Sequence, residues 1–216
     1  MNKIKDLLFD FDGTVIDNSE GIYNCIRYAL DKMGMPPLPE AVLRTFVGPS
    51  LFDSYMTKCE ADPARAELFV KLYRERYAPT GKYEVRLYPG IRTLLQTLRD
   101  RGYRLAVCSS KPWEFVTAIA KHLEIFDLFD FYSCPRFSDT DSDKTGLIAA
   151  CLAHYGDETA AALMIGDTKY DILAAKNAGV ASLGVLYGFS APGELAACGA
   201  DFLAATVDEI LSVLEA

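Results

Sequence analysis

The chain has 216 residues, with 22 Lys and Arg against 30 Asp and Glu, and a formal net charge of −8. Half of its residues are hydrophobic and 24% are charged, a balance that supports a packed core and excludes wholesale disorder. An acidic chain without a cluster of Lys and Arg is poorly suited to neutralising phosphates along a nucleic acid. We therefore expect no nucleic-acid partner.

The first segments of the chain predict one strand followed by a block of helices. Residues 4–9 form a short apolar run that predicts a buried strand, and the acidic turn Asp10-Phe11-Asp12-Gly13 follows it. From about residue 18 to 79 the pattern is helical. Apolar residues recur at helical spacing over 22–33, where Ser19 is the expected cap and Gly34 the expected stop. Further helices are expected around 40–46, 51–60 and 63–77.

After residue 81 the pattern changes to alternating helices and short apolar strands. Such alternation is typical of βαβ units and predicts an α/β fold with a doubly wound parallel sheet. We expect a catalytic core of residues 1–16 and 81–216, interrupted by an α-helical cap domain at 17–80. The strands are expected at 104–108, near 129–133, at 161–165 and at 181–186, and the helices at 90–101, from 112, at 144–155, 169–178 and 207–215.

Two features bear on localisation. The first residues contain no long apolar stretch, and the longest uncharged segment, 177–193, is broken by Gly, Ser and Pro. Six scattered cysteines without a Cys-x-x-Cys pair are typical of reduced thiols. These features predict a cytoplasmic protein with no membrane partner.

Polar side chains follow the predicted strands at the edge where ligands of such sheets bind. Asp10 and Asp12 follow the first strand, Ser109 and Ser110 the next, and Asp167 a later one, with Asp171 four residues on. Lys144 opens the helix before that later strand. The set combines carboxylates, hydroxyls and an ammonium, and we expect it to converge.

The carboxylates of this set predict a cation. Asp10 and Asp12 are two residues apart on an extended segment, where like charges need a shared proton or a cation. The oxygen ligands Asp10, Asp167 and Asp171 suit Mg²⁺, which shares its coordination shell with water and phosphate.

Four short motifs resemble those of the haloacid-dehalogenase superfamily. They are Asp10-Phe11-Asp12-Gly13-Thr14-Val15, the hydroxyl motif Val107-Cys108-Ser109-Ser110-Lys111-Pro112, the lysine Lys144, and Gly166-Asp167-Thr168-Lys169-Tyr170-Asp171. Their order and spacing are those of the superfamily. The helical insertion after the first motif resembles the small cap of phosphoglycolate phosphatases, β-phosphoglucomutases and a 5′-nucleotidase-like group.

The resemblance implies a role for each matching residue. Asp10 would be the nucleophile that forms an aspartyl-phosphate, and Asp12 the acid and base, with its carbonyl completing the metal ligands. Ser109 and the turn at Gly13 and Thr14 would hold phosphoryl oxygens, and Lys144 would offset the negative charge. Residues expected on the substrate side are Ser110, Lys111 and Arg44.

The implied protein is a Mg²⁺-dependent phosphatase that hydrolyses small phosphate monoesters, with phosphoglycolate or a 5′-nucleotide as the leading substrate. Its partner would be a small phosphorylated metabolite, and the chain would be a monomer or a homodimer.

Several alternatives compete with this interpretation. A β-phosphoglucomutase-like sugar phosphomutase shares the same chemistry, and a receiver-like phospho-acceptor module shares the paired acids, the hydroxyl and the Lys. A haloacid dehalogenase is disfavoured because the first motif of those enzymes lacks the second carboxylate, which is present here as Asp12. The Cys59 to Arg65 spacing of a cysteine phosphatase is disfavoured because Glu60 and Asp62 repel phosphate and Pro63 lacks an N–H.

Overall fold

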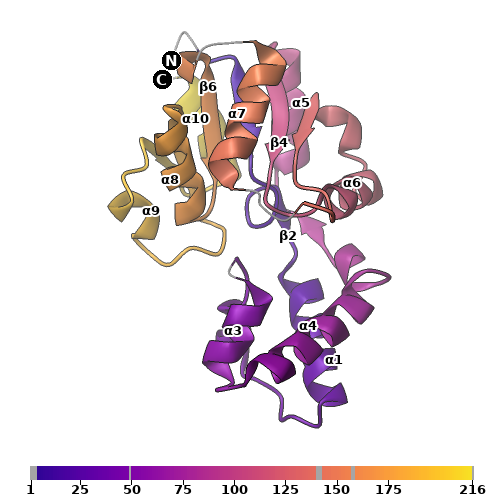
Figure 1. Ribbon diagram of the computed structural model, residues 1–216. Coiled ribbons are helices and arrows are strands. Elements are labelled where there is room, and N and C mark those ends of the chain that lie inside the picture. The colour runs from indigo at the N-terminus through magenta and orange to yellow at the C-terminus, as the bar shows by residue number, and fades with distance from the viewer. Residues whose placement is uncertain (1–3, 49, 140–142, 157–158, 216) are drawn as a thin grey trace. The chain divides into compact units, whose positions relative to one another are not determined.

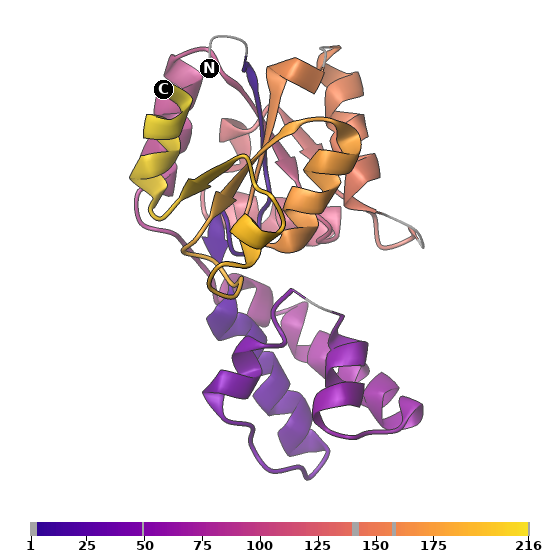
Figure 2. The ribbon, with the colours of Figure 1, turned by 90° about the vertical axis from the view of Figure 1, so that its left-hand side faces the viewer.

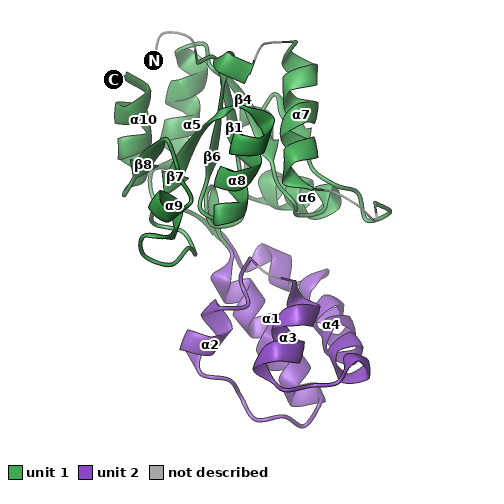
Figure 3. Cartoon of the chain, turned by 60° about the vertical axis from the view of Figure 1, so that its left-hand side comes forward, with its two compact units in different colours: residues 1–17, 86–216 green, residues 18–85 purple. Residues whose placement is uncertain are grey.

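The computed structural model describes residues 4–48, 50–139, 143–156 and 159–215. It divides into two compact units, one of residues 1–17 and 86–216 and the other of residues 18–85 (Figure 3). Among the described helices, none is both long and apolar enough to cross a bilayer.

The first unit is built on a six-stranded parallel sheet in the order β5-β4-β1-β6-β7-β8. This confirms the predicted α/β class. Figure 1 labels β4 and β6 of this sheet. The central strands β1, β4 and β6 are almost entirely buried, as their unbroken apolar sequences require. The strands are β1 (Asp6–Phe9), β4 (Arg104–Cys108), β5 (Phe131–Ser133), β6 (Ala162–Gly166), β7 (Ala181–Val185) and β8 (Phe202–Ala204).

Helices cover both faces of the sheet (Figure 2). On one face, α7 (Lys144–Tyr155) and α8 (Lys169–Ala178) bury Ile148, Cys151 and Ala175 against Leu8 and Met164. On the other, α5 (Ile91–Asp100) packs against β4 and α10 (Val207–Glu215). The remaining helices of this unit are α6 (Trp113–His122) and α9 (Glu194–Ala197), with short 3-10 turns at η2 (Phe126–Leu128) and η3 (Thr159–Ala161).

The second unit is helical. Its helices are α1 (Ser19–Lys32), α2 (Glu40–Arg44), α3 (Leu51–Lys58) and α4 (Pro63–Tyr77), followed by the 3-10 turn η1 (Gly81–Tyr83). The N-cap of α1 is Asn18 rather than the expected Ser19, and it makes no side-chain capping bond. Tyr55 of α3 stacks on Phe69 of α4 with ring centroids 4.2 Å apart. This aromatic pair is part of the unit's core.

A small antiparallel pair, absent from the sequence-based prediction, lies where the chain leaves and re-enters the first unit. Strand β2 (Ile16–Asp17) pairs with β3 (Arg86–Leu87), and Asp17 lies opposite Arg86. The second unit extends to Val85 instead of the expected residue 80. The physical reason is local: η1 packs on α1, and Gly21 donates a backbone hydrogen bond to the Glu84 carbonyl.

Candidate active site

Backbone hydrogen bonds, within the turn and to β6, hold the acidic turn after β1 in place. The Asp10 N–H donates to the Ile165 carbonyl at 2.8 Å, and the N–H groups of Val15 and Ile16 both donate to the Phe11 carbonyl. Gly13 has a φ of +86°, and a Cβ there would lie 2.2 Å from Asp167 Oδ2. Only glycine therefore allows this turn to approach the neighbouring strand end so closely.

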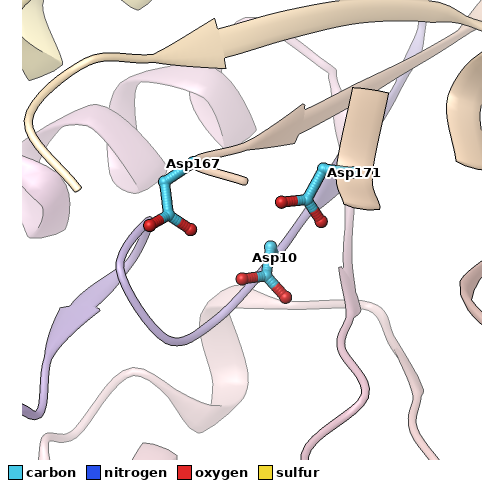
Figure 4. Close-up of side chains that lie close together, drawn as sticks. All are labelled: Asp10, Asp167 and Asp171. Carbon is cyan, nitrogen blue, oxygen red and sulfur yellow. The ribbon is translucent and has the colours of Figure 1, made fainter. Parts of the chain in front are cut away.

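Three buried carboxylates meet at the carboxyl ends of β1 and β6, as Figure 4 shows. Asp10 follows β1, Asp167 follows β6, and Asp171 comes from the first turn of α8. One oxygen from each lies within 4.8 Å of the others. Burial raises the pKa of Asp10 to about 6, against the pull of Lys144. Burial, and then the charge of Asp10, raise the pKa of Asp167 well above its ordinary value. Burial and the neighbouring carboxylates therefore both act against full ionisation of the cluster.

Lys144 is the ammonium of this cluster. As the first residue of α7 it extends Nζ to 2.5 Å from Asp10 Oδ1 and 2.6 Å from Asp171 Oδ1, and its side chain is 10% exposed. Burial opposes the charged form, yet the two carboxylates hold the pKa of Lys144 above its ordinary value. The contact with Asp171 is an ion pair without hydrogen-bond geometry at that oxygen. Lys144 therefore compensates part of the buried negative charge.

Asp171 has a second task within its own helix. Its Oδ2 accepts hydrogen bonds from the Thr168 N–H at 2.9 Å and the Thr168 hydroxyl at 2.7 Å, which completes a capping box for α8. With Lys144 at Oδ1, both oxygens have short contacts. The sequence predicted Asp171 as a metal ligand but did not predict these contacts of its two oxygens. Asp171 does lie in the carboxylate cluster.

The loop after β4 carries the predicted hydroxyl residues. Ser109 is buried, its N–H donates to the Ser133 carbonyl, and its Oγ accepts a long bond of 3.4 Å from the Lys111 N–H. Ser110 is exposed. Lys111 was expected on the substrate side, but its Nζ lies 2.7 Å from Asp12 Oδ2. The two carboxylates of the first motif thus have different ammonium partners.

Thr14 belongs to the acidic turn, and its side chain faces Asp167. It is buried, its hydroxyl donates to Asp167 Oδ1 at 3.4 Å, and its carbonyl accepts a bond from the Tyr187 hydroxyl at 3.0 Å. Its side chain is therefore engaged with Asp167, and this does not test the expected phosphate contact, which was through the backbone N–H groups of the turn. Its backbone still belongs to the acidic turn.

Sequence reasoning assigned no site role to the segment after β7, which supports Asp167. The Phe189 N–H donates to Asp167 Oδ2 at 2.8 Å. A Cβ on Gly188 would lie 2.3 Å from the Asp167 Cβ. The available signal was position, because residues 187–189 follow a strand that neighbours β6 in the sheet.

The candidate substrate residue Arg44 and the segment from Cys59 to Arg65 both lie in the second unit. Arg44 is the exposed last residue of α2, and Pro49 of the adjoining loop lies outside the described residues. Between Cys59 and Arg65, Asp62 caps α4 and accepts the Arg65 N–H at 2.9 Å. The segment is a helix start with a carboxylate at its N-cap, which further disfavours a cysteine-phosphatase loop.

The residues fit a hard divalent cation. Asp10 and Asp167 offer carboxylate oxygens, and among the described residues Asp167 Oδ1 accepts only the long hydrogen bond from the Thr14 hydroxyl. Three buried carboxylates next to one ammonium also leave uncompensated negative charge, which a cation would offset. An all-oxygen donor set of this kind favours Mg²⁺ over softer metals.

Comparisons with known proteins point to one family. The family model described as "Haloacid dehalogenase-like hydrolase" matches residues 7–185. A "5'-nucleotidase" of Pseudomonas aeruginosa is 38% identical over 97% of this chain and 95% of its own. A "Phosphoglycolate phosphatase" of Vibrio vulnificus is 32% identical over 98% and 96%. The solved structure of a haloacid dehalogenase-like hydrolase from Streptococcus pneumoniae has a TM-score of 0.91 at 31% identity, covering 99% of this chain and 100% of its own.

Proposed function

Because the chain belongs to the haloacid dehalogenase-like hydrolase family and is a phosphatase of that family, we propose that it hydrolyses small phosphate monoesters with Mg²⁺ through an aspartyl-phosphate. The observation that carries the proposal is the buried cluster of Asp10, Asp167 and Asp171 around Lys144. A 5′-nucleotide or phosphoglycolate is the leading substrate, since the two relatives compared above have those activities in their names.

In the first step Asp10 attacks phosphorus while the bond to the leaving oxygen breaks. Asp12 gives its proton to that oxygen, so an alcohol departs and Asp12 is left as a carboxylate. In the second step water attacks the aspartyl-phosphate, Asp12 takes up a proton of the water, and Asp10 is regenerated as inorganic phosphate forms. Protons therefore balance over one turnover.

The other residues hold charge and position. Ser109 and backbone N–H groups of the acidic turn bind phosphoryl oxygens, although the Gly13 N–H is not among them because it donates to the Ile16 carbonyl. Lys144 offsets the charge that Asp10 and phosphate bring together. Asp10, Asp167 and the Asp12 carbonyl would hold Mg²⁺, which when bound supplies positive charge beside the phosphoryl group. The buried position of Asp10 keeps competing water from its carboxylate.

The metal requirement is tested by removing it. EDTA is expected to abolish phosphate release from a panel of nucleoside 5′-monophosphates, 2-phosphoglycolate and sugar phosphates, and excess Mg²⁺ should restore it. Mg²⁺ alone should also raise the melting temperature, because a ligand that binds the native state stabilises it. Full activity with EDTA, or activity with Zn²⁺ alone, would contradict the oxygen-ligand site. Isomerisation of a sugar phosphate without phosphate release would favour the phosphomutase alternative.

We also propose that the helical unit, residues 18–85, is a cap that selects the substrate. Asp17 and Arg86 lie opposite each other in the β2–β3 pair, so a short turn can join them in place of the helical unit. The truncated chain is expected to fold and to cleave an aryl phosphate slowly, because Asp10, Asp12, Ser109, Lys144 and Asp167 remain. It should discriminate little among natural phosphates.

Circular dichroism and a substrate panel measure these outcomes. An Asn-Gly turn and a four-residue Gly/Ser linker provide two versions of the same truncation. Unfolded protein with both linkers would show that the helical unit is needed for the core to fold. Unchanged substrate preference would show that the first unit alone selects the substrate.

A further inference from the structure

Lys111 is a lysine held out of water beside a carboxylate. Its side chain is only 9% exposed, and its Nζ lies 2.7 Å from Asp12 Oδ2, whose side chain is 27% exposed. Burying an ammonium is unfavourable unless a partner compensates it, and here the partner is Asp12. The contact joins two strand ends, because Lys111 follows β4 and Asp12 follows the neighbouring β1.

The backbone around Lys111 fixes where the side chain begins. Its N–H donates to Ser109 Oγ at 3.4 Å, and the next residue, Pro112, is the N-cap of α6. Proline holds its own φ near −65° and restricts the residue before it, so Lys111 has little backbone freedom. The side chain therefore starts from a constrained position between the hydroxyl loop and the acidic turn.

The two oxygens of Asp12 are in different situations. Oδ2 has the Lys111 ammonium, whereas Oδ1 is buried and has no hydrogen-bond partner among the described residues. A buried oxygen without a hydrogen-bond partner destabilises the folded protein. Oδ1 can therefore gain a hydrogen bond by sharing a proton with an incoming group. Lys144 makes its contacts with Asp10 and Asp171, so Lys111 serves the second carboxylate of the turn.

We propose that Lys111 is a positioning residue that binds Oδ2 of Asp12 and so holds Oδ1 as the oxygen that exchanges the proton with the leaving group. This inference rests on the proposed function, in which Asp12 is the acid and base. When Asp12 has given its proton to the leaving oxygen, the Lys111 ammonium also faces the new negative charge. Lys111 acts through Asp12 and needs no contact with the phosphoryl group.

The test compares leaving groups. An alkyl phosphate such as glycerol 2-phosphate needs a proton on its leaving oxygen, whereas the 4-nitrophenolate of 4-nitrophenyl phosphate departs with little help. We measure kcat/KM, which covers the steps up to departure of the leaving group. Lys111→Met is expected to lower kcat/KM for the alkyl ester about 10- to 100-fold, within the range of acid catalysis. The factor by which it lowers kcat/KM for the aryl ester should be at least about ten times smaller.

Three further variants complete the design. Lys111→Arg, which keeps the charge, should recover part of the alkyl-ester activity. Asp12→Asn should show the same dependence on the leaving group, and Lys111→Met combined with Asp12→Asn should be no slower than Asp12→Asn alone. Lys176→Met removes an exposed lysine of α8 outside the site and should leave both constants unchanged.

Several results would overturn the inference. One such result is an equal loss of kcat/KM for the two esters. Others are a change in KM alone and additive effects of Lys111→Met and Asp12→Asn. Each would indicate that Lys111 is a phosphate ligand or a structural residue. Those results leave the proposed function standing as long as Asp12→Asn discriminates between the esters. If the unsubstituted protein released no phosphate from either ester, both the proposed function and this inference would fail. Melting temperatures of all variants separate a loss of catalysis from a loss of folding.

Discussion

The Asp10→Asn variant is expected to lose turnover by about 10⁶-fold, the scale of loss when an enzyme's nucleophile is removed. An amide cannot attack phosphorus to form the aspartyl-phosphate. The acid-quenched wild-type protein should carry one phosphoryl group per chain during turnover, as mass spectrometry measures, and the variant should carry none.

Folding of the variant provides the internal check. Burial raises the pKa of Asp10 to about 6, so the site already disfavours a charge at this position, and a neutral amide removes that strain. Lys144 keeps Asp171 as a partner. The melting temperature of Asp10→Asn should therefore not fall. The matched control is Asp127→Asn, an exposed aspartate of the same unit, which should keep full turnover. Turnover of Asp10→Asn within tenfold of wild type would refute the nucleophile assignment.

Of the single substitutions proposed for this protein, Lys144→Met is expected to lower the free energy of unfolding the most. It leaves the carboxylates of Asp10 and Asp171 buried without their ammonium partner. Breaking a buried ion pair by removing one partner costs about 3–5 kcal/mol. For a chain of this length, a melting temperature lower by about 6–20 °C would follow. Turnover should fall by at least about 10²–10³-fold, because the charge developing on phosphate also loses a compensating group. Thermal melting in EDTA and phosphate release in Mg²⁺ measure the two effects separately.

Lys169 offers a matched control for that substitution. Like Lys144 it is the first residue of a helix that follows a loop, but its side chain is 44% exposed and lies 3.5 Å from Glu194. An exposed pair contributes about 0–1 kcal/mol, so Lys169→Met should melt almost as wild type does. Adding Asp171→Asn to Lys144→Met should restore part of the lost stability, because it removes one uncompensated charge. Equal melting of Lys144→Met and Lys169→Met would contradict the ion pairs described here.

Much of the fold could be predicted from local sequence signals. The predicted bounds of β4, α7, α8 and α10 are confirmed at both ends, because apolar periodicity and flanking glycines such as Gly156 and Gly179 mark them within the chain. The short elements β2, β3, β8 and α9 were missed. Elements of two to four residues carry too little local pattern, and pairing with a distant segment decides whether they form.

For the candidate site, the sequence by itself determined which residues stand at the strand ends, since parallel strands bring their carboxyl ends to one edge. Asp10, Ser109 and Asp167 do follow β1, β4 and β6, but that these three strands are neighbours in the sheet was not predicted. The partner of each side chain was decided only by the tertiary structure. Lys111 and Lys144 have the same charge, yet one binds Asp12 and the other Asp10 and Asp171. The physical reason is that an ion pair depends on the direction and reach of side chains from separate strands, and no local pattern in the sequence encodes that geometry.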